Sequence, residues 1–204
     1  MVERQLRGRG IRDERVLAAM LEIPRELFVP PEARDSCYGD WPLPIGHGQT
    51  ISQPYMTALM AESLELTGEE TVLEVGTGSG YAAAVLGALA ANVVSVEIVP
   101  ALADFARENL RAAGRGGNVA VVCGDGSVGF PEMAPYDAIS VAAGAPAIPA
   151  ALLEQLRDRG HLVIPVGRWD QQELRVLVKD GGKASERVAT GCMFVPLRGS
   201  DGWR

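Results

Sequence analysis

Val72-Leu-Glu-Val-Gly-Thr-Gly-Ser-Gly-Tyr81 is the stretch of this 204-residue chain that decides its fold. A short apolar run leads into three glycines at alternate positions and then into a segment with the spacing of a helix, Tyr81–Leu89. A strand that ends in a glycine turn before a helix brings a ligand close to the backbone at the helix amino terminus, which carries roughly half a positive charge. The stretch therefore predicts a strand-turn-helix unit that binds a small molecule.

The rest of the chain repeats the alternation of strand and helix. Short, continuously apolar strands separated by helical segments indicate βαβ units and a buried parallel sheet. The predicted fold class is α/β, a doubly wound, mostly parallel sheet of the Rossmann-like type. The expected strands are Thr71–Val75, Asn92–Glu97, Val119–Cys123, Tyr136–Val141 and His161–Val166, and the expected helices are Asp13–Leu21, Pro54–Leu66, Tyr81–Leu89, Ala101–Ala112 and Pro149–Leu156.

The two ends of the chain depart from this alternation. Leu27–Pro54 is rich in proline and glycine and is predicted to be irregular, and such a long structured loop is usually functional or a lid. Near the other end, Glu173–Val178 and Arg187–Phe194 have strand character, and Lys179-Asp-Gly-Gly-Lys183 between them is a hairpin signal, so the sheet is expected to end in antiparallel strands. The length predicts one domain, 1–204. Its expected parts are an N-terminal helix and ligand loop (1–53), a cofactor-binding core (54–167) and C-terminal strands with a tail (168–204).

Composition excludes several classes of protein. Nineteen Lys and Arg against 26 Asp and Glu give a net charge of −7, which argues against a surface that binds nucleic acid through phosphate contacts. No apolar run is long enough to span a membrane, and the amino terminus lacks the apolar core of a secretory signal. Three cysteines, odd in number and far apart at Cys37, Cys123 and Cys192, fit neither a disulfide framework nor a metal site. We therefore expect a cytoplasmic, monomeric protein with no metal and no membrane or nucleic-acid partner.

Three acids flank the predicted ligand site. Glu74 precedes the first glycine, and Glu97 ends the next strand, where a carboxylate can accept both hydroxyls of a ribose. Asp125-Gly126 follows the third strand, where the aspartate can accept an adenine amino group. A solvated strand end for Glu74 and an Asx turn for Asp125 remain open as structural interpretations. Acid-x-Gly-x-Gly-x-Gly followed by an acid after the second strand resembles the class I S-adenosylmethionine-dependent methyltransferases, whose cofactor has a sulfonium and no phosphate.

A second resemblance names the acceptor. Pro42-Leu-Pro-Ile-Gly46, Gly48-Gln-Thr-Ile-Ser-Gln-Pro54, Gly124-Asp-Gly126 and Phe194-Val-Pro-Leu197 closely resemble the protein-L-isoaspartate (D-aspartate) O-methyltransferases, and the resemblance covers nearly the whole chain. It implies transfer of a methyl group from S-adenosyl-L-methionine to the free α-carboxyl of L-isoaspartyl residues in damaged proteins and peptides. The products would be the methyl ester and S-adenosyl-L-homocysteine.

The resemblance also implies site residues. Val195-Pro196 is expected to lie beside an extended substrate peptide, with main-chain hydrogen bonds that tolerate many sequences. The implied catalytic residue is Ser52; the implied substrate-binding residues are Ile45, Ser52, Val195 and Pro196; and the implied cofactor-binding residues are Gln49, Thr50, Ile51, Ser52, Glu74, Gly76, Gly78, Gly80, Glu97, Asp125 and Gly126.

The chemistry of the acceptor favours a positioning role for Ser52. An isoaspartyl α-carboxyl resembles a terminal carboxyl, with a pKa around 3.3–3.7, and is already ionised at neutral pH. The reaction then needs no general base, only alignment of the reacting atoms at roughly 3–3.5 Å with water excluded. Ser52 can donate its hydroxyl to the carboxylate; its alternative role is a cap for the helix expected from Pro54.

Two other functions remain open at this stage. One is a small-molecule or RNA methyltransferase that shares only the cofactor half, although the acidic balance argues against RNA and Gly48–Pro54 would be unexplained. The other is a cofactor-binding protein without turnover, which the intact Gln49–Ser52 segment argues against.

Overall fold

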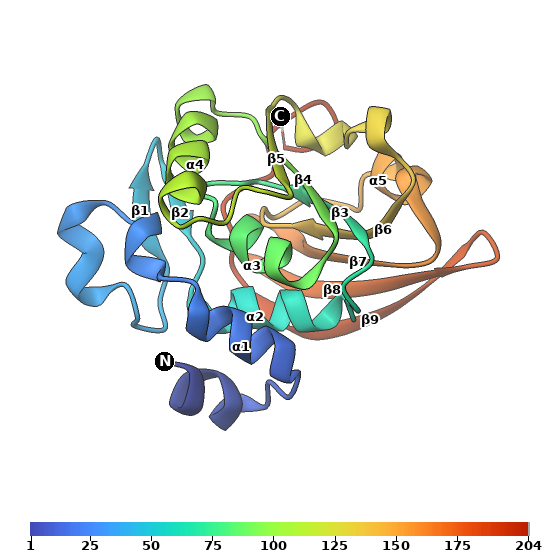
Figure 1. Ribbon diagram of the computed structural model, residues 1–204. Coiled ribbons are helices and arrows are strands. Elements are labelled where there is room, and N and C mark those ends of the chain that lie inside the picture. Colours follow the sequence, from blue (N-terminus) through green and yellow to red (C-terminus); the bar gives the residue numbers. More distant parts are fainter. Residues whose placement is uncertain (204) are drawn as a thin grey trace.

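The computed structural model describes residues 1–203, and its centre is a seven-stranded sheet (Figure 1). The strand order is β5-β4-β3-β6-β7-β8-β9; the pairs from β5 to β7 are parallel, and β8 and β9 are antiparallel to their neighbours. The predicted α/β class, with antiparallel strands at the C-terminal end, is confirmed. The strands are β3 (Thr71–Val75), β4 (Asn92–Glu97), β5 (Val119–Cys123), β6 (Tyr136–Val141), β7 (Leu156–Arg168), β8 (Gln171–Asp180) and β9 (Lys183–Cys192).

Helices cover both faces of the sheet, because side chains alternate along each strand and both faces are apolar. On one face, Val72 and Val93 belong to a buried cluster shared with α1 to α4; on the other, Leu73 and Val94 belong to a second cluster shared with α5. The fold is therefore doubly wound. The helices are α1 (Glu14–Glu22), α2 (Pro54–Ser63), α3 (Tyr81–Leu89), α4 (Pro100–Ala112) and α5 (Ala150–Gln155), with a π-helical turn η1 (Val2–Leu6) and 3₁₀ turns η2 (Arg7–Arg9), η3 (Arg25–Phe28), η4 (Pro31–Ser36), η5 (Gly126–Val128) and η6 (Pro131–Met133).

Local signals set most of the observed boundaries. The bounds of β3, α3, β4, β5 and β6 are those predicted from the sequence. Helix α1 starts one residue later than expected because Asp13 is its cap and accepts the N–H groups of Arg15 and Val16. Helix α2 ends at Ser63 and not at Leu66, since Glu65 adopts a left-handed conformation (φ +53°) that ends a helix.

The C-terminal hairpin is confirmed and is longer than predicted. Gly181 and Gly182, at φ +57° and +79°, form the two-residue turn between Asp180 and Lys183. Figure 1 shows β8 and β9 projecting from the body of the molecule as a long arm.

The N-terminal loop contains a hairpin that the sequence analysis missed. β1 (Leu43–Gly46) and β2 (Gln49–Ile51) pair antiparallel within the stretch predicted to be irregular. The turn places Gly46, His47 and Gly48 at φ +87°, +53° and +70°, so a non-glycine residue occupies a left-handed position. Proline and glycine are usually depleted in strands, and their density here hid the two short strands.

None of the helices in the described part of the chain combines the length and the apolar character needed to cross a membrane.

Candidate functional site

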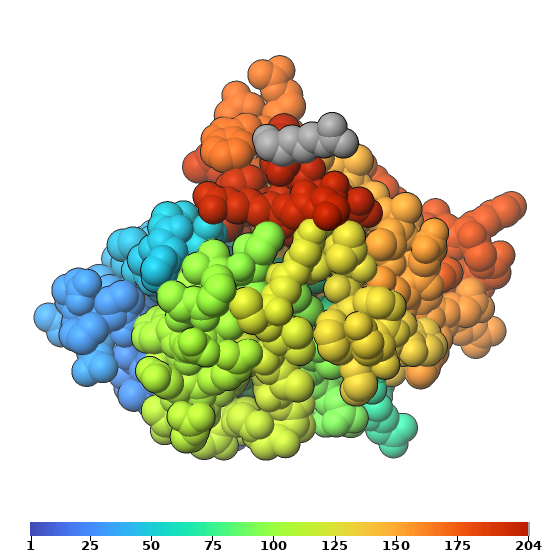
Figure 2. All heavy atoms as spheres, turned by 90° about the horizontal axis from the view of Figure 1, so that it is seen from above, coloured from blue at the N-terminus to red at the C-terminus, as the bar shows by residue number. Residues whose placement is uncertain are grey.

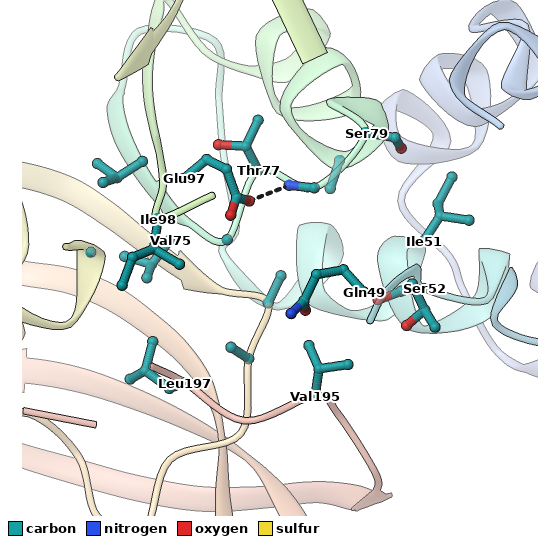
Figure 3. Close-up of a pocket in the computed structure, with 18 of the residues that line it drawn as sticks. Gln49, Ile51, Ser52, Val75, Thr77, Ser79, Glu97, Ile98, Val195 and Leu197 are labelled. Atoms are coloured by element: carbon teal, nitrogen blue, oxygen red, sulfur yellow. Dashed lines mark hydrogen bonds between the residues drawn. The ribbon is translucent and has the colours of Figure 1, made fainter. Parts of the chain in front are cut away.

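A cavity of about 790 Å³ opens at the carboxyl ends of β3, β4 and β6. The chain leaves β3 toward β4 on one side and returns as β6 on the other, so the strand order reverses at this point, and ligands of α/β sheets bind there. Figure 3 shows Glu97, Thr77 and Val75 on one side of the cavity, Gln49 and Ser52 on another, and Val195 and Leu197 on a third. The stretch predicted as an irregular loop, Leu27–Pro54, and the C-terminal tail thus close a site that the sheet opens.

The glycine turn forms the floor of this cavity. Gly76 and Gly78 line it with φ of +92° and +55°, a backbone conformation that other residues rarely adopt. A Cβ atom on Gly78 would lie 3.2 Å from the Ile45 side chain, so the β1–β2 hairpin packs directly on the turn. Gly80 has another function: it does not line the cavity, and a Cβ there would lie 3.2 Å from Ala106 of α4.

Glu97 lies at the end of β4 and lines the cavity. Oε2 accepts the N–H of Gly78 at 2.8 Å, the dashed bond in Figure 3, and Oε1 accepts the N–H of Val99 at 3.0 Å. The residue is only 5% exposed. Each carboxylate oxygen has capacity for a further donor, so Glu97 is positioned to bind a pair of neighbouring hydroxyls.

Glu74 does not line the cavity, which corrects the prediction that it contacts the ligand directly. In β3 it is paired in register with Ser95 of β4, and its side chain is fully buried between the strands, where Oε2 accepts the Ser95 hydroxyl. The Ser95 hydroxyl also meets that of Thr77, a cavity residue, at 2.6 Å. Burial raises the pKa of Glu74 to about 8, against the opposing effect of the Ser95 hydrogen bond and with a further upward contribution from Glu97. Glu74 is thus a neutral acid that supports the turn from beneath.

The buried acid predicts a pH dependence of stability. The folded-state pKa of Glu74, about 8, exceeds its ordinary value of 4.5, so folding takes up a proton between these values and the free energy of unfolding decreases as pH rises through this range. Glu74→Gln removes this linkage. We expect the difference in unfolding free energy, Glu74→Gln minus wild type, to increase by about 2–3 kcal/mol from about pH 5.5 to pH 7.5. Urea denaturation at each pH measures this difference. Exposed Glu69→Gln is the control; equal pH slopes for wild type and Glu74→Gln would contradict the assignment.

Asp125 holds the C-terminal tail instead of lining the cavity. Its Oδ1 accepts the N–H and hydroxyl of Ser127 at 2.9 and 2.6 Å, an Asx turn, and its Oδ2 accepts the N–H of Ser200 at 2.7 Å. Burial alone would raise the pKa of Asp125, but these hydrogen bonds keep it below the ordinary value. Figure 2 shows the tail, in red, lying across the surface against the yellow segment that follows β5. The adjacent Gly126 does line the cavity.

Ser52 lies at the wall between this cavity and a second one of about 630 Å³. The cap of α2 is Gln53, so the alternative role of Ser52 as the helix cap is wrong. Within residues 1–203 the Ser52 hydroxyl has no hydrogen-bond partner, and it is free to bind a ligand from either side. The second cavity is lined by β2, the start of α2, the end of β9 and the segment that follows it; its residues include Arg9, Tyr55, Met193 and Phe194.

The structure brings together most of the predicted site. Ile45, like Glu74, Gly80 and Asp125, lies behind the cavity and not on its wall. The sequence analysis missed several residues that line the cavity, among them Thr77, Tyr81 and Leu197. Their position in the sequence was the available signal, because Thr77 and Tyr81 adjoin the predicted glycines and Leu197 adjoins Pro196. The predicted residues on the wall are Gln49, Thr50, Ile51, Ser52, Gly76, Gly78, Glu97, Gly126, Val195 and Pro196.

The donors and walls fit an adenosyl ligand with an amino-acid end. Glu97 offers a partly satisfied carboxylate for a ribose, and Val96, Ile98 and Leu197 offer apolar surface for a flat ring. The left-handed glycines and the start of α3 leave backbone groups open to the ligand. A loop that binds phosphate would not need an acid such as Glu97 beside it. The second cavity reaches the first at Ser52, so a second molecule can approach the ligand there.

Comparison with known proteins agrees with this geometry. The profile of the family "Protein-L-isoaspartate(D-aspartate) O-methyltransferase (PCMT)" matches residues 1–202. A protein-L-isoaspartate O-methyltransferase of Methanoculleus marisnigri is 56% identical over 204 residues, which cover all of this chain and 92% of the relative. A solved protein-L-isoaspartate O-methyltransferase superposes with a TM-score of 0.86 at 32% identity and covers 98% of this chain and 67% of that one. A Plasmodium falciparum structure of the same description, in complex with S-adenosyl-L-homocysteine, gives a TM-score of 0.81 at 28% identity, with 97% and 96% covered.

Proposed function

The chain belongs to the protein-L-isoaspartate(D-aspartate) O-methyltransferase family, and on that premise we propose that it methylates the free α-carboxyl of L-isoaspartyl residues in damaged proteins and peptides. The methyl donor is S-adenosyl-L-methionine, and the products are the methyl ester and S-adenosyl-L-homocysteine. The observation that carries this proposal is the position of Ser52, with an unengaged hydroxyl, on the wall shared by two cavities.

The first cavity binds the methyl donor in this proposal. Glu97 binds the ribose hydroxyls, and the backbone at Gly76 and Gly78 lies against the amino-acid end. Gln49, Thr50 and Ile51 cover the ligand from β2, and Gly126 closes the site after β5. When bound, the donor supplies an activated methyl group, and the cavity residues orient it toward Ser52.

The second cavity receives the substrate peptide. It is bordered by the extended segment from Cys192 to Val195, which can hydrogen-bond a peptide main chain without reading its sequence. Val195 borders both cavities, and Pro196 borders the first. Ile45 contributes indirectly in this arrangement, since it packs on Gly78 beneath the junction.

Ser52 orients the substrate carboxylate at the junction of the cavities. The carboxylate is ionised at neutral pH, so the serine donates a hydrogen bond and removes no proton. The residues around it hold the acceptor oxygen in line with the methyl group and exclude water, which are the two contributions that this reaction needs from the protein.

The remaining features of the proposal concern the whole protein. We propose that residues 1–204 act as one domain, as a monomer in the cytoplasm, without a nucleic-acid partner. The net charge of −7 supports the last point, and the three separated cysteines, none of which is paired in the structure, support a reducing compartment.

Paired peptides that differ only in isoaspartate or aspartate at one position test the proposed activity. With labelled S-adenosyl-L-methionine, we expect methyl incorporation into the isoaspartyl peptide alone, because only its α-carboxyl is free to enter the junction at Ser52. We also expect kcat/KM to show no essential group titrating near about pH 6–7, since no general base is used. Equal labelling of both peptides, or of neither, would refute the proposal.

A further inference from the structure

Arg25 is a buried cation in the middle of the apolar core. It begins η3, it is 0% exposed, and it lies among core residues that include Phe28. No carboxylate forms an ion pair with it within residues 1–203. A charge in this environment needs an explanation beyond packing.

The partners of Arg25 come from three separate segments. Its Nε donates to the carbonyl of Cys37 at 2.7 Å, and its Nη2 donates to the carbonyl of Ser52 at 2.7 Å. Its Cζ lies 4.7 Å from the centroid of the Tyr81 ring, a cation–π contact with the first residue of α3. Nη1 is buried and has no hydrogen-bond partner. Arg25 therefore connects the loop before β1, the Ser52 backbone and the helix that follows the glycine turn.

Stability does not account for this charge. Burial lowers the pKa of Arg25, with Tyr81 and Cys37 acting in the opposite direction, and an arginine remains protonated in proteins nonetheless. Removing a guanidinium from water is costly, and two carbonyls and a ring compensate only part of the cost; apolar residues of similar volume often replace buried ions without loss of stability. What an apolar residue cannot replace is the pair of hydrogen bonds to the carbonyls.

The hydrogen bond to Ser52 fixes a peptide plane at the active centre. The Ser52–Gln53 peptide is trans, so its C=O and N–H point in opposite directions. The carbonyl is held by Arg25 on the core side, and the N–H of Gln53 consequently points away from the core. Gln53 lines the second cavity, and its N–H has no partner among residues 1–203. The guanidinium also polarises this peptide, which strengthens the N–H as a donor.

We propose that Arg25 is a positioning residue for methyl transfer: it holds the Ser52–Gln53 peptide so that the Ser52 hydroxyl and the Gln53 N–H together face the substrate carboxylate. This inference rests on the proposed function. Its contact with Tyr81, which lines the donor cavity, ties the same arginine to the other reactant. Arg25 thus keeps the two hydrogen-bond donors for the substrate carboxylate, the Ser52 hydroxyl and the Gln53 N–H, in a fixed position relative to the methyl-donor site. It touches neither the substrate nor the methyl donor.

Arg25→Met tests the proposal because it keeps the volume and removes the hydrogen bonds. We expect kcat for an isoaspartyl peptide to fall about tenfold, while the Kd of S-adenosyl-L-homocysteine, measured calorimetrically, changes less than about twofold. Arg25→Lys reaches one carbonyl but not both, and we expect it to recover part of the lost kcat. Phe28→Leu is the matched control: it loosens the edge-on contact with Tyr81 (ring centroids 5.5 Å apart) and should lower the Tm with kcat retained.

The outcomes separate this inference from the proposed function. A wild-type enzyme that methylates no isoaspartyl peptide refutes the proposed function. An active wild type with a folded Arg25→Met variant of unchanged kcat refutes only the role of Arg25, as would parallel losses of kcat and of S-adenosyl-L-homocysteine affinity. If Arg25→Met does not fold, Arg25→Lys decides: a several-fold lower kcat at unchanged cofactor affinity supports the role, and an unchanged kcat overturns it.

Discussion

Ser52→Ala is expected to lower kcat for an isoaspartyl peptide about a hundredfold, the effect of removing one preorganised donor from an active centre. The hydroxyl has no hydrogen-bond partner within residues 1–203, so its removal breaks no contact that holds the fold. The bond from Arg25 goes to the Ser52 carbonyl and survives the substitution. The loss is therefore confined to the orientation of the substrate carboxylate.

The measurement separates this effect from cofactor binding. The Kd of S-adenosyl-L-homocysteine for Ser52→Ala should stay within about twofold of wild type, because Glu97, the residue proposed to bind the ribose, is on another wall of the cavity. Ser63→Ala deletes the same group at the far end of α2 and should leave both quantities unchanged. Full activity of Ser52→Ala on several isoaspartyl peptides would show that its hydroxyl has no role.

All seven strands of the central sheet are expected from the sequence, but only β3 to β6 have the predicted bounds; β7 and β8 extend beyond theirs at both ends, and β9 starts and ends earlier than predicted. Strands β3 to β6 are apolar runs bounded by glycine, proline or polar turns, and these local signals place their ends to the residue. The β1–β2 hairpin could not be predicted in the same way. Its strands are short, and the left-handed backbone conformation of His47 could not be predicted from a histidine at this position. It is held by packing on Gly78, a contact between segments about thirty residues apart in the sequence.

The candidate site shows the same division between local and distant information. All three flanking acids follow the expected order along the chain, but only Glu97 reaches the cavity. Glu74 faces Ser95 because of the register between β3 and β4, and Asp125 faces Ser200 because the tail folds back over it. Arg25 gave no signal at all in the sequence, since its importance comes from carbonyls supplied by Cys37 and Ser52. The order of the elements along the chain indicates at which strand end a residue lies. Its hydrogen-bond partners come from segments that are distant in the sequence, and a local pattern does not identify them.

Glu97→Ala is expected to weaken the binding of S-adenosyl-L-homocysteine about 100- to 10,000-fold. A carboxylate that accepts two ligand hydroxyls contributes about 1.5–3 kcal/mol for each charge-assisted bond, and each 1.4 kcal/mol corresponds to a tenfold change in Kd. The substitution also releases the N–H groups of Gly78 and Val99, which Glu97 now holds in place. Loss of the ligand contacts and loosening of the turn act in the same direction.

Calorimetry on three variants distinguishes these two contributions. Glu97→Gln keeps one acceptor oxygen and the shape of the side chain, so its Kd should fall between those of wild type and Glu97→Ala. Glu108→Ala removes an equal charge from the exposed face of α4 and should bind as wild type does. At saturating cofactor, kcat of Glu97→Ala should remain within several-fold of wild type, the reverse of the pattern for Ser52→Ala. A Kd change below about threefold would place the ribose elsewhere in the cavity. The assignment of cofactor binding to Glu97 and of substrate orientation to Ser52 would then be wrong.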